Sequence, residues 1–319
     1  MIIDCSGSLP TAEFFLSDVQ AMRHSHYLHV FGPGCARWVG MDTKECAELI
    51  ASDPDRFVER VIELAAANGR DTMDAWRDAV DAAGIDRSVL HNFHELESLG
   101  EGESCMPNDR IAEICREQGN RIIGFAGVDP GIGAQAAAAE VARAADVLGL
   151  AGIALRPFRH GLRADNRTYY PIYEEASARG IPVWVHCSVN YDRKASMEYA
   201  LPRAVDHVAG DFPDLTILAG HGGWPYAQEM VACAMRHPNL FIDVSALRHL
   251  HMPKPGSGWE PVLHFGNNVL QDQIVIGLDW LQLGYQPEQL ISEIRTLPLR
   301  PAVLDKWLGG NAQRIFGNP

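Results

Sequence analysis

Residues 215–223, LTILAGHGG, form a short apolar run that ends in glycines and a histidine, and residues 181–187, IPVWVHC, follow a similar pattern. A run of four to eight apolar residues bounded by turn residues is typical of a strand that is buried on both faces. Strands of this kind belong to parallel sheets, which helices cover on both sides. The two stretches therefore predict an α/β fold in which polar side chains follow buried strands.

Similar runs recur along almost the whole chain, with helical patterns between them. They lie at residues 2–5, 87–93, 121–128, 151–155, 181–187, 215–219, 240–244 and 273–278. Regular alternation of strands and helices is typical of βα units around a parallel sheet. Eight such runs favour a closed (β/α)8 TIM barrel over an open sheet. The 319 residues fit a single barrel domain that spans residues 1–319.

The longest departure from this alternation follows the first strand, from about residue 10 to about residue 70. It contains Gly32-Pro33-Gly34 and a helical stretch at residues 54–68, together with the histidines His24, His26 and His29. Loops that follow barrel strands lie at the C-terminal mouth of the barrel, where they shape the substrate pocket. We therefore expect an insertion at the mouth, with its histidines on the surface.

Composition and charge restrict the classes of partner. The formal net charge is −14 and the pI is near 5.3, whereas a protein that binds nucleic acid usually needs a basic face. No stretch approaches the roughly 20 apolar residues of a membrane span, and the N-terminus lacks a secretory signal pattern. Seven cysteines without paired spacing indicate a reduced protein. We expect a cytoplasmic protein that binds a small molecule, without nucleic acid or membrane.

Titratable side chains follow three of the predicted strands, as His186, His221 and Asp279. In a barrel, the active site collects residues at the C-terminal ends of the strands. Two imidazoles and a carboxylate can bind a divalent metal or form a general acid/base set. Each alone could be a hydrogen-bonded strand-end residue, but their joint occurrence predicts a functional site. Cys187 is expected to face a helix, because neighbours on a strand point to opposite faces.

Nine phrases occur in order over almost the whole chain: IIDCSGSL, AGIDRSVL, RIIGFAGVDP, GIALRPFRHG, YYPIYEEASARGIPVWVH, FPDLTILAGHGG, PNLFIDVS, IGLDW and GGNAQRIFG. Together they resemble the amidohydrolase-related family that contains aminocarboxymuconate-semialdehyde decarboxylase, aromatic acid decarboxylases and several ring-cleavage hydrolases. The resemblance implies a distorted (β/α)8 barrel with its active site at the mouth. It also implies that His186 and Asp279 are metal ligands, that Asp279 handles protons, and that His221 is an acid/base group or a second-metal ligand.

The N-terminal stretch departs from the pattern of that family, which is Asp-x-His-x-His with both histidines on the metal. Here the stretch is Asp4-Cys5-Ser6-Gly7-Ser8. Alternation along a strand predicts that Asp4, Ser6 and Ser8 share one face and that Cys5 points away from them. The two serines would then stand at the ligand positions. A neutral hydroxyl is a weak ligand beside an imidazole, so the substitution predicts much weaker metal binding there.

Two hypotheses about the cofactor follow. The three strand-end residues either transfer protons without a metal, or they hold a divalent metal (zinc, iron or manganese) with a recruited ligand such as His91 or His94. At strand spacing His91 and His94 face opposite ways, so at most one of them faces the barrel interior. His91 shares its face with Val89, and a packed core histidine fits that position better than a ligand does.

Arg156 and Arg159 follow the fourth strand, at the mouth of the predicted barrel. A guanidinium group is suited to bidentate binding of a carboxylate, so these residues predict a carboxylate-bearing substrate, with a rim ion pair as the alternative. Trp224 is expected to pack at the mouth or to line it. Asp243, at the end of the seventh strand, either orients His221 or satisfies local backbone groups.

The sequence thus predicts an amidohydrolase-type hydrolase that cleaves an ester, thioester, lactone or amide of a small carboxylate-bearing or secondary metabolite. Asp279, His186 and His221 would activate the water. One alternative is the non-oxidative decarboxylation of an aromatic or enoic acid, in which His221 and Asp279 protonate the carbon that loses its carboxylate. Another is a barrel that binds a ligand without catalysis. The family resemblance also implies a homodimer.

Overall fold

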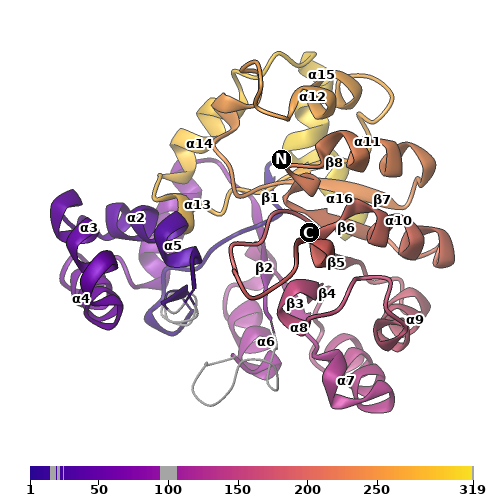
Figure 1. The fold of residues 1–319 in the computed structure, drawn as a ribbon, viewed down its shortest axis with the longest axis horizontal. Helices are drawn as coiled ribbons and strands as arrows, with labels where there is room; N and C mark the ends of the chain where they lie inside the picture. Colours follow the sequence, from indigo (N-terminus) through magenta and orange to yellow (C-terminus); the bar gives the residue numbers. More distant parts are fainter. Residues whose placement is uncertain (15–18, 20–21, 24, 94–105, 318–319) are drawn as a thin grey trace.

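Eight parallel strands form one sheet in the computed structural model, which describes residues 1–14, 19, 22–23, 25–93 and 106–317. The strands pair in chain order, β1 to β8 (Figure 1). They are β1 (Ile3–Asp4), β2 (Arg87–His91), β3 (Ile122–Gly127), β4 (Gly152–Leu155), β5 (Val183–His186), β6 (Ile217–Gly220), β7 (Leu240–Val244) and β8 (Ile274–Ile276). Each overlaps one of the eight predicted runs. The predicted (β/α)8 TIM barrel is confirmed.

Hydrogen bonds connect the last strand to the first. The backbone N–H of Cys5 donates to the carbonyl of Ile276 over 2.8 Å. The carboxylate of Asp4 accepts hydrogen bonds from the backbone N–H groups of Leu278 (2.9 Å) and Ser6 (3.1 Å). The N–H of Asp279 also donates to the carbonyl of Ser6 over 2.9 Å, so the Asp4 side chain adds to a ladder of backbone hydrogen bonds between these segments.

Helices lie outside the strands and connect them (Figure 1). The α-helices after the insertion are α5 (Met73–Ala82), α6 (Asn108–Glu117), α7 (Ala134–Asp146), α8 (Pro157–His160), α9 (Tyr170–Ala178), α10 (Pro202–Asp211), α11 (Ala227–Arg236), α12 (Glu260–Gly266), α13 (Trp280–Leu283), α14 (Pro287–Ile294), α15 (Pro301–Asp305) and α16 (Asn311–Phe316). Shorter helical turns are η1 (Gly119–Arg121), η2 (Pro130–Ile132), η3 (Arg167–Tyr169), η4 (Met197–Ala200), η5 (His221–Gly223), η6 (His249–His251) and the π-helical η7 (Lys306–Gly310). None of the helices in the described ranges has the length and apolar character that crossing a lipid bilayer requires.

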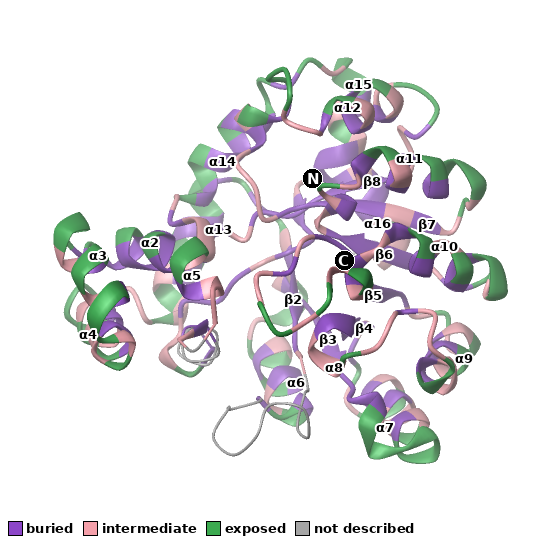
Figure 2. Cartoon of the chain, in the orientation of Figure 1, coloured by how far each residue is buried: buried purple, intermediate pink, exposed green. Residues whose placement is uncertain are grey.

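The helix α5 shows how the sequence specifies these elements. The hydroxyl of Thr72 accepts a hydrogen bond from the N–H of Ala75 (3.1 Å), which caps the N-terminus of the helix. Trp76, Ala79 and Val80 are buried. Their spacing of three and four residues puts them on one face, which packs on the barrel. Figure 2 shows the same pattern around the molecule, with buried strands and with helices that are exposed on their outer faces.

In the described part of the connection between β1 and β2, the further helices are α2 (Tyr27–Val39), α3 (Thr43–Ser52) and α4 (Pro54–Ala67) (Figure 1, indigo to violet). Helix α2 crosses α13 at very short range. A Cβ atom on Gly34 would lie 1.9 Å from the carbonyl oxygen of Gln282, and one on Gly284 would lie 2.2 Å from the carbonyl oxygen of Gly34. Glycine at position 34 of the Gly32-Pro33-Gly34 motif therefore lets the insertion pack directly against the helix that follows β8.

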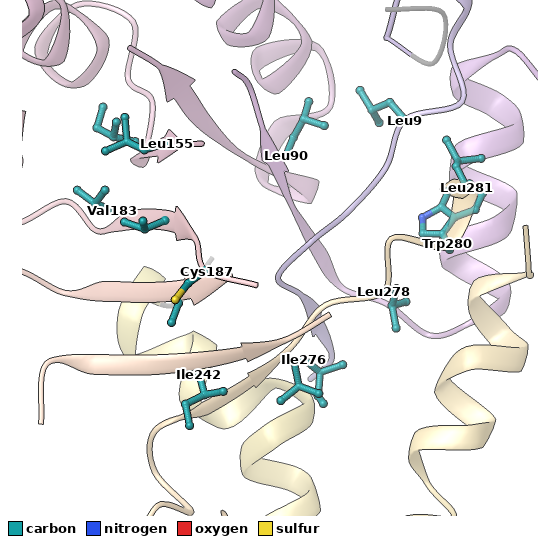
Figure 3. Packing of buried hydrophobic residues seen from close by; sticks show 14 of the residues in the cluster. Leu9, Leu90, Leu155, Val183, Cys187, Ile242, Ile276, Leu278, Trp280 and Leu281 are labelled. Atoms are coloured by element: carbon teal, nitrogen blue, oxygen red, sulfur yellow. The ribbon is translucent and has the colours of Figure 1, made fainter. Parts of the chain in front are cut away.

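One large apolar cluster lies between the strands and the surrounding helices. Leu155, Val183, Cys187, Ile242 and Ile276 belong to it (Figure 3). The thiol of Cys187 is buried and contacts the carbonyl oxygen of Ala200 at 3.4 Å. The prediction that Cys187 faces the helical layer is confirmed.

A second cluster fills the barrel interior below the strand ends. Its buried members are Ile3, Cys5, Val89, Ile123, Phe125, Ala154, Trp184, Leu218, Val275 and Ala312. The prediction for the N-terminal stretch is wrong in one respect, because Cys5 lies in this interior cluster with Ile3. Strand β1 ends at Asp4 and the chain turns at Cys5 and Ser6, so the two-residue alternation does not continue to Ser8.

Candidate active site

A cavity of about 200 Å³ opens at the C-terminal ends of the strands. Nine aromatic side chains line it, and they come from both the barrel and the insertion. They belong to Phe14, Tyr27, Phe31, Phe93, Phe158, Trp184, Tyr191, Trp224 and Trp259. The insertion supplies the first three of these rings and so forms one side of the cavity.

The structure brings the three predicted strand-end residues together in this cavity. The rings of His186 and His221 have their centroids 5.1 Å apart. The Nδ1 atom of His221 lies 4.0 Å from Oδ2 of Asp279. Because β5, β6 and β8 end at the same edge of the barrel, residues almost 100 positions apart in the chain become neighbours.

Three residues that follow β6, β7 and β8 have left-handed backbones. The φ angles are 60° at His221, 57° at Ala246 and 45° at Asp279. A residue other than glycine in this region costs on the order of 1–3 kcal/mol, and such residues cluster at functional sites. All three line the cavity. The strained backbone thus coincides with the predicted proton-transfer residues.

A network of hydrogen bonds surrounds the buried carboxylate of Asp243 at the end of β7. Its Oδ2 atom accepts hydrogen bonds from Trp184 Nε1 (2.8 Å), Ser245 Oγ (2.9 Å) and Ser6 Oγ (3.0 Å). Ser245 Oγ also lies 2.8 Å from Nδ1 of His221. Asp243 thus reaches His221 through Ser245, which the sequence analysis did not identify. Ser245 follows Asp243 by two residues, and this spacing on a strand was the available signal.

Burial shifts the pKa values of the polar groups in this network. It raises the pKa of Asp243 to about 6, against the opposing effect of the hydrogen bonds from Trp184, Ser245 and Ser6. It lowers the pKa of His221 to about 4. Burial, and then the positive charge of His221 when protonated, lower the pKa of His186 well below its ordinary value. At neutral pH both imidazoles are therefore neutral and Asp243 is mostly ionised.

The two serines of the N-terminal stretch have separate partners. Ser6 Oγ donates to Asp243, whereas Ser8 Oγ donates to Oε1 of Gln282 over 3.0 Å. Both serines are almost completely buried. Ser6 therefore belongs to the carboxylate network, and Ser8 connects the N-terminal stretch to α13.

An indole ring occupies the space where three histidines converge. The ring centroid of Trp184 lies 4.5 Å from that of His91, 5.3 Å from that of His221 and 6.2 Å from that of His186. A Cβ atom on Gly220 would lie only 2.1 Å from this indole. Trp184 and His186 are two residues apart on β5 and so share a strand face, which points into the barrel.

The described residues do not fit the metal that the family resemblance implies. Within them, no group of three or more His, Cys, Asp or Glu side chains could hold a metal ion. His186, His221 and Asp279 lie together in the cavity, but with His91 they do not form a group that could hold a metal ion. The indole of Trp184 packs against the ring of His91, Ser245 engages Nδ1 of His221, and Oδ2 of Asp279 accepts a hydrogen bond from the N–H of Ala246 (2.9 Å).

His91 packs as a core histidine instead. Its ring lies 4.5 Å from Trp184 and meets the edge of Phe125 at 5.3 Å between centroids. Burial, and then the nearby His221, lower the pKa of His91 to about 3. His26 and His29 stack on each other at 5.1 Å at the outer face of the insertion. His24 and His94 lie outside the described residues.

The predicted substrate-binding residues all line the cavity. The guanidinium of Arg156 lies 4.1 Å above the ring of Phe93. Arg159 Nη1 is 3.5 Å from Oδ2 of Asp192. Arg159 therefore forms an ion pair, which was the alternative to binding a substrate carboxylate. The indole N–H of Trp224 donates to the carbonyl of Ser257 over 3.0 Å.

Known proteins resemble this chain in sequence and in fold. The Amidohydrolase family model matches residues 101–317. The 2-amino-3-carboxymuconate-6-semialdehyde decarboxylase of Dictyostelium discoideum is 26% identical in an alignment of 239 positions that covers 66% of this chain. The match spans 65% of the length of that curated relative.

Solved structures extend the likeness to the whole barrel. An uncharacterised TIM-barrel protein from Bordetella bronchiseptica is 22% identical, with a TM-score of 0.71 over 98% of this chain and 97% of that one. A 5-carboxyvanillate decarboxylase from Novosphingobium aromaticivorans, complexed with manganese and 4-hydroxy-3-methoxy-5-nitrobenzoic acid, is 18% identical. Its TM-score is 0.62 over 100% of this chain and 96% of that one. At these identities the likeness concerns the fold.

Proposed function

We propose that this chain, which belongs to the amidohydrolase family, catalyses the non-oxidative decarboxylation of an aromatic or enoic acid. The observation that carries the proposal is the cavity, which combines aromatic walls, two guanidinium groups and the pair formed by His221 and Asp279. The sequence relative in Dictyostelium discoideum and the carboxyvanillate structure are both decarboxylases. The activities of these two proteins favour decarboxylation over hydrolysis, which was the main prediction from the sequence.

The size and walls of the cavity favour a single planar ring or a conjugated chain. The cavity volume of about 200 Å³ lies below the roughly 300–1,000 Å³ of sites for drug-sized ligands. Aromatic side chains stack on flat π-systems in offset or edge-to-face geometry, with about 0.5–1.5 kcal/mol gained per ring pair beyond burial. A small unsaturated acid fits these walls better than a flexible aliphatic chain does.

Arg156 and Arg159 would bind an anionic group of this acid. Both guanidinium groups line the cavity, and a guanidinium can hold a carboxylate or a phenolate through charge-assisted hydrogen bonds. For decarboxylation, the reacting carboxylate should face away from the arginines, because a salt bridge would stabilise it in the ground state. The retained anionic group would be the one that the arginines hold.

The reaction requires a proton at the carbon that bears the carboxylate. The proton adds to this carbon through a π electron pair of the ring or double bond, the bond to the carboxylate then breaks with its electron pair restoring that π bond, and CO2 leaves. One solvent proton is consumed per turnover, and no oxidant or reductant is needed. His221 and Asp279, at the strand ends, would deliver the proton. The low pKa of His221 makes its imidazolium a stronger acid than a free imidazolium.

Hydrolysis is the second candidate, and one observation favours it. His221 is neutral at neutral pH, so it could take a proton from a water molecule as a general base. That water would attack an ester, thioester, lactone or amide carbonyl. In both reactions the proton passes through the same side chains, so products must distinguish them.

Neither scheme uses a metal, since the described residues do not fit one. Protein purified without affinity metal should contain far less than one equivalent of zinc, iron or manganese by elemental mass spectrometry. Its activity should survive dialysis against a chelator. A stoichiometric metal that is lost together with activity in His186→Ala would contradict the metal-free proposal and leave the decarboxylase proposal to the product assay.

The product assay screens hydroxybenzoic, pyridinecarboxylic and conjugated enoic acids for released CO2, and the matching esters and lactones for released acid. We expect CO2 release that falls about 100-fold or more in Asp279→Asn. The exposed pair Lys44 and Glu48 on α3 provides a control, since Lys44→Gln should retain full activity. Acid release from esters without CO2 release would overturn decarboxylation in favour of hydrolysis.

A further inference from the structure

A chain of hydrogen bonds connects a fully buried carboxylate with an imidazole of the cavity. Ser245 Oγ donates to Oδ2 of Asp243 at 2.9 Å, and Nδ1 of His221 lies 2.8 Å from Ser245 Oγ. We propose that this chain fixes His221 as the tautomer with its proton on Nδ1. Ser245 and Asp243 are then positioning residues that leave Nε2 of His221 as the atom that exchanges protons with the substrate.

The number of donors around Asp243 sets the direction of each hydrogen bond. Its Oδ2 atom also accepts hydrogen bonds from Trp184 Nε1 (2.8 Å) and Ser6 Oγ (3.0 Å). An ionised carboxylate only accepts hydrogen bonds, and a serine hydroxyl has one hydrogen to donate. The hydrogen of Ser245 therefore points to Asp243, and its oxygen can only accept from His221. For that bond to exist, Nδ1 of His221 must carry a hydrogen.

No other acceptor of the cavity competes for Nδ1 at hydrogen-bond distance in the described residues. Oδ2 of Asp279 is 4.0 Å away, which is beyond the usual limit for such a bond. The same oxygen accepts a hydrogen bond from the N–H of Ala246 at 2.9 Å. Ser245 therefore determines which ring nitrogen of His221 is protonated.

A neutral imidazole has one N–H donor and one nitrogen with a lone pair. With the hydrogen on Nδ1, the lone pair is on Nε2, on the opposite side of the ring from Ser245. The side chain of His221 lines the cavity. Nε2 takes up a solvent proton and passes it to the substrate carbon that loses CO2. This last role rests on the proposed function, whereas the tautomer rests on the hydrogen bonds alone.

The same geometry gives Ser6 a role. The family pattern has a metal-binding histidine at this position, and here the hydroxyl of Ser6 supports the carboxylate that holds Ser245. Trp184 supports the same carboxylate and fills the space between the histidines. Ser6 and Trp184 therefore both support the network that orients His221.

The test is the nitrogen NMR spectrum of the full-length protein labelled with ¹⁵N at histidine, with the His221 signals assigned by their loss in His221→Gln. At pH 7 we expect a protonated Nδ1 and an unprotonated Nε2. Ser245→Ala should shift His221 toward the Nε2–H tautomer. Ser88→Ala, which removes a buried hydroxyl on β2 with no hydrogen bond to His221, should leave the spectrum unchanged.

Three results would overturn the proposal: an Nε2–H tautomer in the wild type, an imidazolium at pH 7, or an unchanged tautomer in Ser245→Ala. Kinetics give the second measurement. With an acid that is turned over, Ser245→Ala should lower kcat about 100-fold and change KM little, because a wrong tautomer removes proton transfer but not binding. An equal loss in Ser88→Ala would contradict a specific role of Ser245. A correct tautomer without any CO2 release would overturn the proposed function and keep the positioning role.

Discussion

The indole ring of Trp184 contacts more of the candidate site than any strand-end histidine does. It lies beside the rings of His91, His186 and His221 and donates a hydrogen bond to Asp243. A large apolar ring in this place removes water from the imidazoles. This desolvation is the main reason for the lowered pKa values of the histidines.

His91 gives a test of this desolvation through the pH dependence of stability. Its pKa is about 3 in the folded protein and near 6.5 when the chain is unfolded. Above pH 6.5 both states are neutral. As the pH falls below 6.5, only the unfolded state takes up a proton, so the free energy of unfolding decreases.

His91→Phe removes this titration and keeps a ring of similar size against Phe125. Between pH 7.5 and 5.5 the free energy of unfolding of the wild type should fall by about 1.4 kcal/mol relative to the variant. Urea unfolding of both proteins at the two pH values measures the difference. The substitution of an exposed histidine, His264→Gln, is the control. The free energy of unfolding of this variant should change between the two pH values by the same amount as that of the wild type. A pH-independent difference for His91→Phe would show that His91 is not desolvated.

At the level of the elements, β5 and β6 fit together through a glycine. Gly220 ends β6, and a Cβ atom there would lie 2.1 to 2.7 Å from three carbons of the Trp184 ring on β5. The glycine before His221 in the AGHGG stretch is therefore required by its neighbour and not by its own backbone angle. The contact couples the end of β6, which carries His221, to the position of the indole.

Gly220→Ala should consequently destabilise the protein by about 1–3 kcal/mol, because a methyl group in a packed core displaces its neighbours. It should also change the tryptophan fluorescence of the folded state. Gly210→Ala on α10 is the matched control, since its Cβ would have only ordinary contact, at 3.5 Å from His237. Alanine at a helical position is expected to stabilise by about 0.5–1 kcal/mol. Equal melting temperatures for the two variants would contradict the proposed packing.

On the scale of the whole molecule, the insertion and the barrel share the cavity. Helix α2 carries Tyr27 and Phe31 into its wall and crosses α13 at Gly34. Arg37 of α2 also donates to the carbonyl of Leu283 over 3.0 Å. These contacts fix the aromatic wall relative to the strand ends. The predicted homodimer and cytoplasmic location remain predictions.

Gly34→Ala should therefore lower the stability of the protein and also weaken substrate binding. Its Cβ would meet the backbone of Gln282 at 1.9 Å, so the helices must separate, and we expect a loss of about 1–3 kcal/mol in the free energy of unfolding. The displaced wall should raise KM more than it lowers kcat. Gly32→Ala, on the same helix, meets only side-chain atoms, of which the nearest are the flexible tips of Ile50 at 3.0 Å and Leu28 at 3.3 Å. It should stay close to the wild type in both measurements, and a larger effect at position 32 than at 34 would contradict this account.

The sequence alone determined the barrel and its strand ends. Apolar runs with terminal polar residues predict strands locally, and parallel strands in a barrel must bring His186, His221 and Asp279 to one edge. The departure at Ser6 and Ser8 was also visible in the sequence. Trp184 could have been identified, because it shares a strand face with His186.

Only the tertiary structure decided which groups Ser6 and Trp184 contact. Ser6 and Asp243 are 237 positions apart, and their hydrogen bond exists because closure of the barrel brings β1 near β7. The turn after Asp4 interrupts the alternation that would place Ser6 and Ser8 alike. The position of the Trp184 ring depends on the absence of a side chain at Gly220, on the next strand. These are contacts between distant segments, which local periodicity does not encode.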